Sequence, residues 1–139
     1  VNASSHVAFI NALHHRIEDN KLFRLVVIGS VAGDLGKKSN YIYGACKSFL
    51  ETYLQGLQHQ VADNKTTQIT IVKPGPTRTP MIDNAKISQF NIADPRKVAQ
   101  AIVHATYNGK LNVYTPWYWR YVMMVISTMP KKLLYKFLS

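Results

Sequence analysis

Apolar residues along the chain change from helical spacing to short continuous runs. Residues 3–18 carry apolar side chains at intervals of three or four, which predicts an amphipathic helix. Its predicted apolar face consists of Val7, Ile10, Leu13 and Ile17. Residues 23–29 then form an almost unbroken apolar run, as is typical of a parallel strand buried on both faces. The chain is therefore predicted to begin with a helix and a buried strand.

The same alternation continues through the next fifty residues. Residues 41–62 carry a broad apolar stripe that predicts a long helix. That stripe consists of Phe49, Leu50, Tyr53, Leu54 and Leu57. Residues 68–73 contain a β-branched run from Ile69 to Val72, which predicts a second strand.

The last third of the chain repeats the pattern once more. Asp94 suits a helix N-cap and Pro95 suits the first helical position, so we predict a helix from there to about Tyr107. Residues 111–115 are a short third strand, and from Pro116 onward we expect one amphipathic helix, interrupted or ended near Pro130.

Helices that alternate with buried strands place the chain in the α/β class. We predict a partial Rossmann-like αβα sandwich, with a parallel sheet of three strands, four helices and right-handed crossovers. Residues 1–139 are treated as a single region. The strand at 23–29 is expected at the margin of the sheet, where its backbone N–H and C=O groups would be unpaired. Such an edge favours a homodimer or a higher oligomer, an exchange of elements between chains, or a place within a longer polypeptide.

Three residues near the predicted element ends form a candidate proton-transfer site. Ser30 follows the first predicted strand, and Tyr43 and Lys47 lie four residues apart on the next helix, so their side chains share one face. A phenol titrates near about pH 10, and a positive charge close to it favours its ionised form. Tyr43 could therefore exchange a proton with an alcohol or carbonyl oxygen.

The tyrosine–lysine pair alone is a weak signal. In a chain of this composition, roughly one such pair is expected by chance, and the alternative is a surface helix with an exposed lysine. The position of Ser30, thirteen residues before Tyr43, favours the site. Tyr41 has an alanine, not a lysine, at the same spacing.

With two further segments, these residues resemble the short-chain dehydrogenase/reductase family. That family carries an Asn at the start of one helix, a Ser after the next strand, and Tyr-xxx-Lys on the following helix. A Pro-Gly turn then follows another strand, with a Thr four residues past the Gly. In this chain the pattern falls on Asn2, Ser30, Tyr43, Lys47, Pro74, Gly75 and Thr79. The later helix and the last strand also look like those of the family.

The resemblance implies an NAD(P)-dependent oxidoreductase that transfers a hydride between the nicotinamide and a carbonyl or alcohol substrate. Tyr43 would donate or accept the proton, Lys47 would assist it and hold the nicotinamide ribose, and Ser30 would hydrogen-bond the substrate oxygen. Asn2 would hold a water that links Lys47 to solvent. The residues implied in cofactor binding are Tyr43, Lys47, Pro74, Gly75, Thr77 and Thr79.

The family's opening half has no counterpart in the 139 residues. The glycine-rich turn that binds the pyrophosphate is absent, and Gly29, Gly33 and Gly36 lack its spacing, so we assign them to the active-site loop. The resemblance implies a C-terminal catalytic half without the N-terminal dinucleotide-binding half. Binding of NAD or NADP should then be compromised and the isolated fragment inactive. The alternative is a truncated or split, non-catalytic fragment that acts only in association.

Charge and composition argue against several other classes of protein. The formal net charge is +10, but the cations are dispersed along the sequence, which argues against nucleic acid as a partner. Cys46 is the single cysteine, so there is no disulfide framework, and the histidines lack metal-ligand spacing. We therefore predict no metal site. The first residues do not look like a signal peptide, which favours a cytoplasmic location.

The segment 117–138 combines aromatic, aliphatic and basic residues, as a helix at a membrane surface does. Two interpretations stay open: a terminal helix that packs on the sheet, and peripheral membrane contact. Within the family, residues 120–125, with Met129 and Pro130 after them, most resemble the reductases that complete decaprenylphosphoryl-ribose epimerisation. The predicted substrate is therefore a small molecule, with a lipid-linked or phosphorylated sugar as the finer option.

Overall fold

The computed structural model describes residues 3–14, 21–80 and 92–138. Strands β1 (Phe23–Ile28), β2 (Thr67–Pro74) and β3 (Asn112–Thr115) form a parallel sheet in the order β1-β2-β3. Around it lie α1 (Ser4–His14), the one-turn 3-10 helix η1 (Val31–Gly33), α2 (Tyr41–Gln60), α4 (Pro95–Tyr107), α5 (Trp119–Thr128) and α6 (Lys131–Leu138). The predicted α/β sandwich with a parallel sheet is confirmed.

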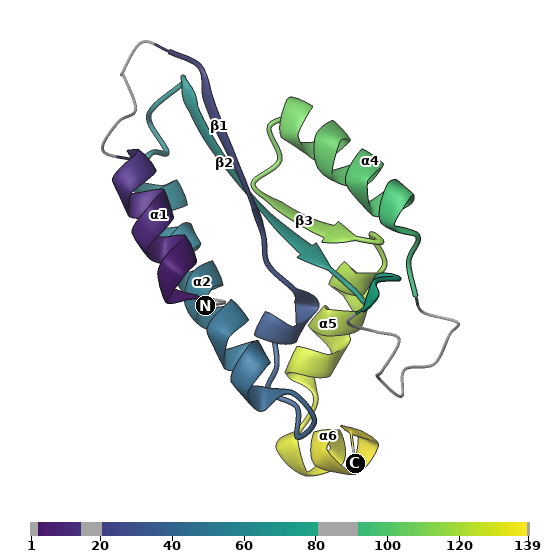
Figure 1. Ribbon diagram of the computed structural model, residues 1–139. Helices are drawn as coiled ribbons and strands as arrows, with labels where there is room; N and C mark the ends of the chain where they lie inside the picture. The colour runs from purple at the N-terminus through teal and green to yellow at the C-terminus, as the bar shows by residue number, and fades with distance from the viewer. Residues whose placement is uncertain (1–2, 15–20, 81–91, 139) are drawn as a thin grey trace.

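Helices cover the two faces of the sheet separately, as Figure 1 shows: α1 and α2 lie on one side and α4 on the other. Successive side chains of β2 face the two helix layers alternately. Ile69 and Ile71 belong to the core formed with α2, and Thr70 donates to the carbonyl of Lys110 after α4 (2.8 Å). The chain moves across the sheet in one direction, from β1 to β2 and from β2 to β3, but α2 and α4 lie on opposite faces. The two crossovers therefore have opposite handedness, and the prediction that both are right-handed is wrong.

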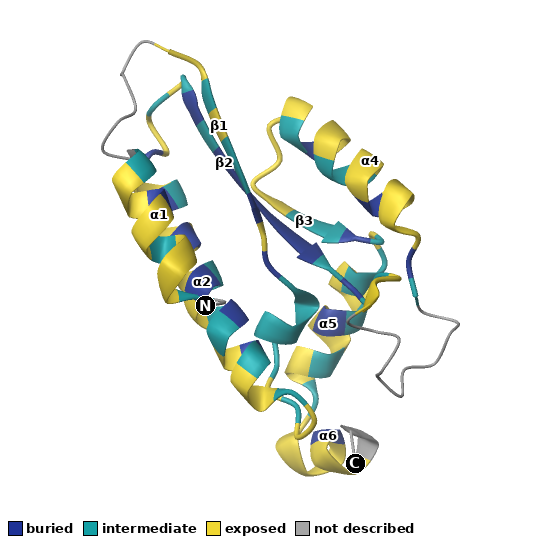
Figure 2. Cartoon of the chain, viewed as in Figure 1, coloured by how far each residue is buried: buried dark blue, intermediate teal, exposed yellow. Residues whose placement is uncertain are grey.

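The main core lies between β2 and the long helix α2. Figure 2 shows the buried residues along β2 and on the sheet-facing side of α2. The core side chains of these two elements include Leu50, Leu54, Leu57, Ile69 and Ile71. Most of the apolar stripe predicted on α2 is therefore packed inside the chain, and Phe49, at 53% exposure, remains outside. Only a small part of that stripe is free to meet a second subunit.

Strand β1 is less buried than its sequence predicts. Val27 is buried against α2, but Ile28 is 45% exposed. The reason is its place in the sheet: among the described residues, β1 pairs with β2 alone and forms the margin. The prediction of an edge strand is confirmed, and the prediction of burial on both faces is wrong.

Local sequence signals determine where α4 begins and ends. The Asp94 side chain accepts a hydrogen bond from the backbone N–H of Arg96 (2.8 Å), and Pro95 occupies the first turn, as predicted. After the helix, Gly109 has a φ of +67°, a conformation that favours glycine.

The end of the chain differs from its prediction. Instead of one interrupted helix from residue 116, the structure has α5 and α6, so the described part contains five α-helices rather than four. The division lies at Pro130, whose carbonyl accepts from the N–H groups of Leu133 and Leu134 and so begins α6.

Candidate functional site

Ser30 lies where β1 leaves the sheet. The backbone N–H of Gly29 donates to the carbonyl of Val72 on β2 (2.7 Å), which holds the end of β1 in place. Ser30 is the N-cap of η1, and its hydroxyl oxygen accepts from the N–H of Ala32 (3.1 Å). Ser30 is partly exposed. Its hydroxyl is therefore fixed at the carboxyl end of a strand, the usual place for a site in a parallel sheet.

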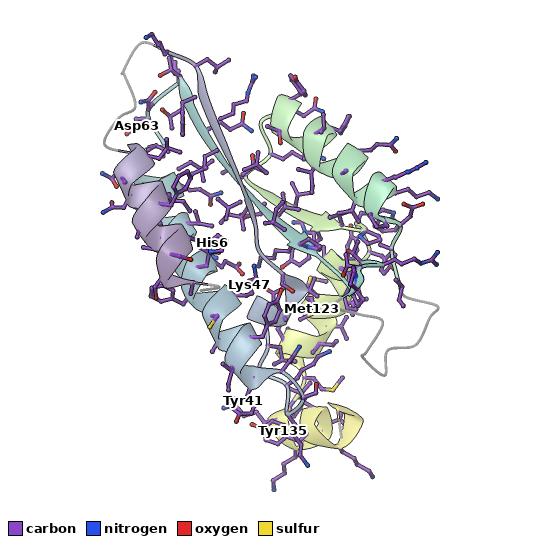
Figure 3. All side chains as sticks on the ribbon, in the orientation of Figure 1. His6, Tyr41, Lys47, Asp63, Met123 and Tyr135 are labelled. Carbon is purple, nitrogen blue, oxygen red and sulfur yellow. The ribbon has the colours of Figure 1, made fainter. Side chains whose placement is uncertain are left out.

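Tyr43 and Lys47 lie on the first two turns of α2, beside the same strand end. The Lys47 ammonium donates to the carbonyl of Ile28 (3.1 Å) and lies 5.7 Å from the centroid of the Tyr43 ring. Figure 3 shows Lys47 between α2 and the end of β1. Lys47 is only 9% exposed, and this burial lowers its pKa, an effect that nearby Cys46 opposes. The structure thus brings a cation and a phenol to the strand end that carries Ser30.

Two glycines allow η1 to pack directly on α2. A Cβ placed on Gly44 would lie 2.7 Å from the carbonyl oxygen of Ala32. A Cβ on Gly33 would lie 3.1 Å from the backbone of Lys47. The loop that follows Ser30 therefore contacts the helix backbone that carries Tyr43 and Lys47. Gly33 was predicted to belong to the active-site loop, and the structure places it in the loop that contacts this helix.

Gly44→Ala is expected to lower the free energy of unfolding by about 1–3 kcal/mol, because the new methyl group would force η1 away from α2. Gly56→Ala is the matched control on the same helix, since a Cβ there would meet open space. The control should raise the free energy of unfolding by about 0.5–1 kcal/mol. Urea unfolding of both variants is the measurement. Equal changes in the two would show that the close contact at Gly44 has no energetic role.

The Pro-Gly turn follows β2, as the sequence predicts. The N–H of Gly75 donates to the carbonyl of Thr115 (3.0 Å), and the Thr77 hydroxyl donates to the carbonyl of Gly75 (3.0 Å). A Cβ on Gly75 would overlap the indole ring of Trp119. Trp119 therefore lines this turn. This contact was not predicted from the sequence. Thr79 is exposed, and Asn2 lies outside the described residues.

A buried ionic cluster next to this turn was not predicted. The Lys73 ammonium contacts Asp34 Oδ1 (2.6 Å), Glu51 Oε1 and the Tyr114 hydroxyl (3.2 Å). The Tyr114 hydroxyl in turn donates to Asp34 Oδ2 (2.9 Å). Burial alone lowers the pKa of Lys73, but its hydrogen bonds to Asp34, Glu51 and Tyr114 outweigh this and raise it. Lys73 is therefore held in its charged form.

The sequence contains one signal for this cluster. Lys73 is a basic residue at the end of an apolar, β-branched run, and a lysine in a buried strand needs a carboxylate partner. It is 6% exposed in the structure. The identity of its partners could not be predicted, because Asp34 and Tyr114 are distant in sequence.

A cavity of about 580 Å³ lies between α4 and β3, and its lining extends to Tyr114 of this cluster and to Arg78 after the Pro-Gly turn. Its lining includes Lys97, His104, Val113 and Trp117, and does not include Ser30, Tyr43 or Lys47.

Among the described residues, no group of three or more His, Cys, Asp or Glu side chains could hold a metal ion. No helix in the described ranges has the length and apolar character needed to cross a membrane.

Comparisons with known sequences show which proteins the chain is similar to. A family model described as short chain dehydrogenase matches residues 1–91. An uncharacterized oxidoreductase of Mycobacterium tuberculosis is 30% identical over 107 residues, which cover 77% of this chain and 42% of the relative. An uncharacterized oxidoreductase of Streptomyces coelicolor is 29% identical over 111 residues, with 78% and 42% covered. The chain spans less than half the length of these curated relatives.

Solved structures show the same fold. A short chain dehydrogenase from Burkholderia cenocepacia in complex with NADP has a TM-score of 0.82 at 18% identity, over 100% of this chain and 56% of that chain. An angucycline C-6 ketoreductase with bound NADP has a TM-score of 0.65 at 16% identity, over 82% and 49%. A short-chain dehydrogenase from Sphingobium yanoikuyae in complex with NADPH has a TM-score of 0.60 at 23% identity, over 78% and 46%.

Proposed function

Because this chain belongs to the short-chain dehydrogenase family, we propose that it carries the catalytic residues of an NAD(P)-dependent oxidoreductase. The substrate class is a carbonyl compound or the corresponding alcohol. The observation that carries this proposal is the arrangement of Lys47, which donates to the carbonyl at the end of β1 and lies beside the Tyr43 ring, next to Ser30. This arrangement pairs a proton donor with a cation at the end of a parallel strand.

The proposed proton transfer uses three side chains. In the reducing direction Tyr43 gives its hydroxyl proton to the carbonyl oxygen as hydride adds to the carbon; in the oxidising direction both transfers reverse. The ammonium of Lys47 would stabilise the negative charge that forms on the Tyr43 oxygen. Ser30 would donate a hydrogen bond to the same substrate oxygen and so orient it.

Residues for the nicotinamide end of a cofactor are present. NAD(P) would supply or accept the hydride when bound. The Lys47 ammonium has three N–H donors, and one of them binds the carbonyl of Ile28. The described residues offer no second acceptor, so the other two donors are available to ribose hydroxyls. Neighbours of known structure bind NADP or NADPH, which supports the same cofactor here. Pro74, Gly75, Thr77 and Thr79 are proposed to line the carboxamide side.

The pyrophosphate end of the cofactor needs a glycine-rich turn that these 139 residues do not contain. We expect the chain alone to bind NADPH weakly or not at all in isothermal titration. One polypeptide that unites this chain with a dinucleotide-binding half, called the joined polypeptide below, should bind NADPH and reduce ketones. Micromolar affinity of the chain alone would contradict the division into halves. A joined polypeptide that binds NADPH but reduces no ketone or aldehyde of a broad panel would favour a non-catalytic fragment that acts only in association.

We propose a homodimer or higher oligomer as the form in which the chain acts. The support is the margin of β1, which no other described strand pairs with, together with exposed Phe9, Ile42 and Phe49 on the two helices of one layer. Light scattering that shows only a 15.7 kDa monomer at about 0.1–0.5 M salt would contradict this.

A finer proposal concerns the substrate and its location. The end of the chain exposes aromatic and aliphatic side chains beside cations, as a membrane-surface segment does. These residues are Trp117, Arg120, Tyr121, Met124, Val125, Lys131, Lys132 and Leu133. We propose that residues 117–138 contact a membrane from the cytoplasm and bring the site to a lipid-linked or phosphorylated sugar. Sedimentation with anionic phospholipid vesicles should carry the joined polypeptide down, and its absence from the pellet would contradict the proposal.

A further inference from the structure

The Lys73 cluster joins three segments of the proposed site to β3. Asp34 lies four residues after Ser30, at the end of η1, and contacts Lys73 Nζ at 2.6 Å. Glu51 lies one helical turn after Lys47 on the same face of α2. Lys73 directly precedes the Pro-Gly turn. Tyr114 is the partner of Lys73 in the register of β2 and β3. The η1 loop, α2 and the end of β2 carry proposed site residues, and each has one side chain in this cluster, while Tyr114 adds β3.

The composition of the cluster is not explained by stability alone. Glu51 already pairs with the single charge of Lys73, so Asp34 adds a second, largely buried carboxylate and leaves the cluster with a formal charge of −1. Removing a carboxylate from water is costly, and buried ion pairs often add little net stability. Both oxygens of Asp34 are nevertheless occupied, one by Lys73 and the other by the Tyr114 hydroxyl. Such a two-sided hold fixes the position of the loop.

The loop packs closely on α2, but among the described hydrogen bonds only those of the Asp34 side chain tie residues 30–34 to the sheet. The other described hydrogen bonds of residues 30–34 are short-range turn bonds, from Ala32, Gly33 and Asp34 back to Ser30 and Val31. The close approach to α2 at Gly33 and Gly44 sets how near the loop lies to the helix, but a glycine contact does not prevent sliding along it. Asp34, bonded to β2 and β3, supplies the missing lateral restraint.

From this geometry, and resting on the proposed function, we propose that Asp34 is a positioning residue for the reaction. Through Lys73 and Tyr114 it holds the Ser30 loop so that the Ser30 hydroxyl meets the substrate oxygen beside Tyr43. Asp34 itself does not contact the substrate.

Asp34→Asn in the joined polypeptide tests this inference. The substitution keeps the size of the side chain and leaves Lys73 and Glu51 as a matched pair, so the fold should remain intact. A shift of the Ser30 hydroxyl should lower kcat about 10- to 100-fold, because reaction rates depend steeply on position. The KM for NADPH should change less than about twofold, since the cofactor-binding residues stay in place. Asp63→Asn, at the far end of α2 (Figure 3), is the control and should leave both constants unchanged.

A double-mutant cycle with Ser30→Ala separates positioning from general damage. If Asp34 acts through Ser30, Asp34→Asn should lower kcat less than about twofold further once Ser30 is alanine. Should Asp34→Asn destabilise the fold, Tyr114→Phe serves in its place, because it removes the donor to Asp34 Oδ2 and one acceptor of Lys73 but leaves all three charged groups. Equal reductions of kcat in both backgrounds, or no reduction in either, would overturn the inference and leave the proposed function standing. Normal turnover of Ser30→Ala itself would overturn both.

Discussion

Replacing Tyr43 with phenylalanine is expected to lower the turnover of the joined polypeptide about 10²- to 10⁴-fold, the usual effect of removing a general acid. Only the hydroxyl is lost, so the ring remains beside Lys47 and the fold should not change. Binding of NADPH should persist. The measurements are the rate of NADPH-dependent ketone reduction and the affinity for NADPH.

Tyr41→Phe is the control for this substitution. Tyr41 lies two residues earlier on α2 and is 63% exposed, so loss of its hydroxyl should leave turnover within about twofold of wild type. Turnover of Tyr43→Phe near that of wild type would refute the assignment of Tyr43 as the proton donor. An equal loss of turnover in both variants would show that any change at the start of α2 lowers turnover, and that the Tyr43 hydroxyl has no special role.

Replacing Lys73 with methionine is expected to lower the free energy of unfolding by about 3–5 kcal/mol, because Asp34 and Glu51 would remain buried without a cation. Methionine has a similar length, so little cavity is created. Urea unfolding of the joined polypeptide measures the change. Lys65→Met, in the exposed turn before β2, is the control and should stay within about 0.5 kcal/mol of wild type. A Lys73→Met variant of the same stability would show that the cluster contributes nothing.

The same cluster should make stability depend on alkaline pH. Despite its burial, Lys73 has a pKa raised above the ordinary 10.5 by its hydrogen bonds to Asp34, Glu51 and Tyr114. The folded chain therefore binds this proton more tightly than the unfolded chain does. The resulting stabilisation is complete below the unfolded pKa and is lost as the pH rises through the folded value. Burial also raises the pKa of Tyr114, which acts in the same direction.

Local patterns in the sequence predicted the elements well. The strand at 68–73 and the start of α4 were recognisable because β-branched runs, an N-cap aspartate and a first-turn proline act within a few residues. Ser30, Tyr43 and Lys47 could be proposed for a related reason. Once the fold is known, their positions at a strand end and on one helix face place the three side chains near one another.

Features that depend on distant segments could not be predicted. The Lys73 cluster joins residues up to eighty positions apart, and no local pattern selects Asp34 or Tyr114 as partners. Likewise, the exposure of Ile28 follows from the place of β1 at the sheet margin, not from its apolar sequence. The packing of Trp119 on Gly75 depends on how the last helices fold back onto the Pro-Gly turn.

A crystal structure of the joined polypeptide with NADP⁺ and a bound alcohol tests most directly whether Ser30, Tyr43 and Lys47 form one catalytic site. We expect the Lys47 ammonium on the ribose hydroxyls of the nicotinamide. The hydroxyls of Tyr43 and Ser30 should both lie within about 3–3.5 Å of the alcohol oxygen. A nicotinamide ring bound away from the end of β1, for example in the cavity between α4 and β3, would contradict the assignment.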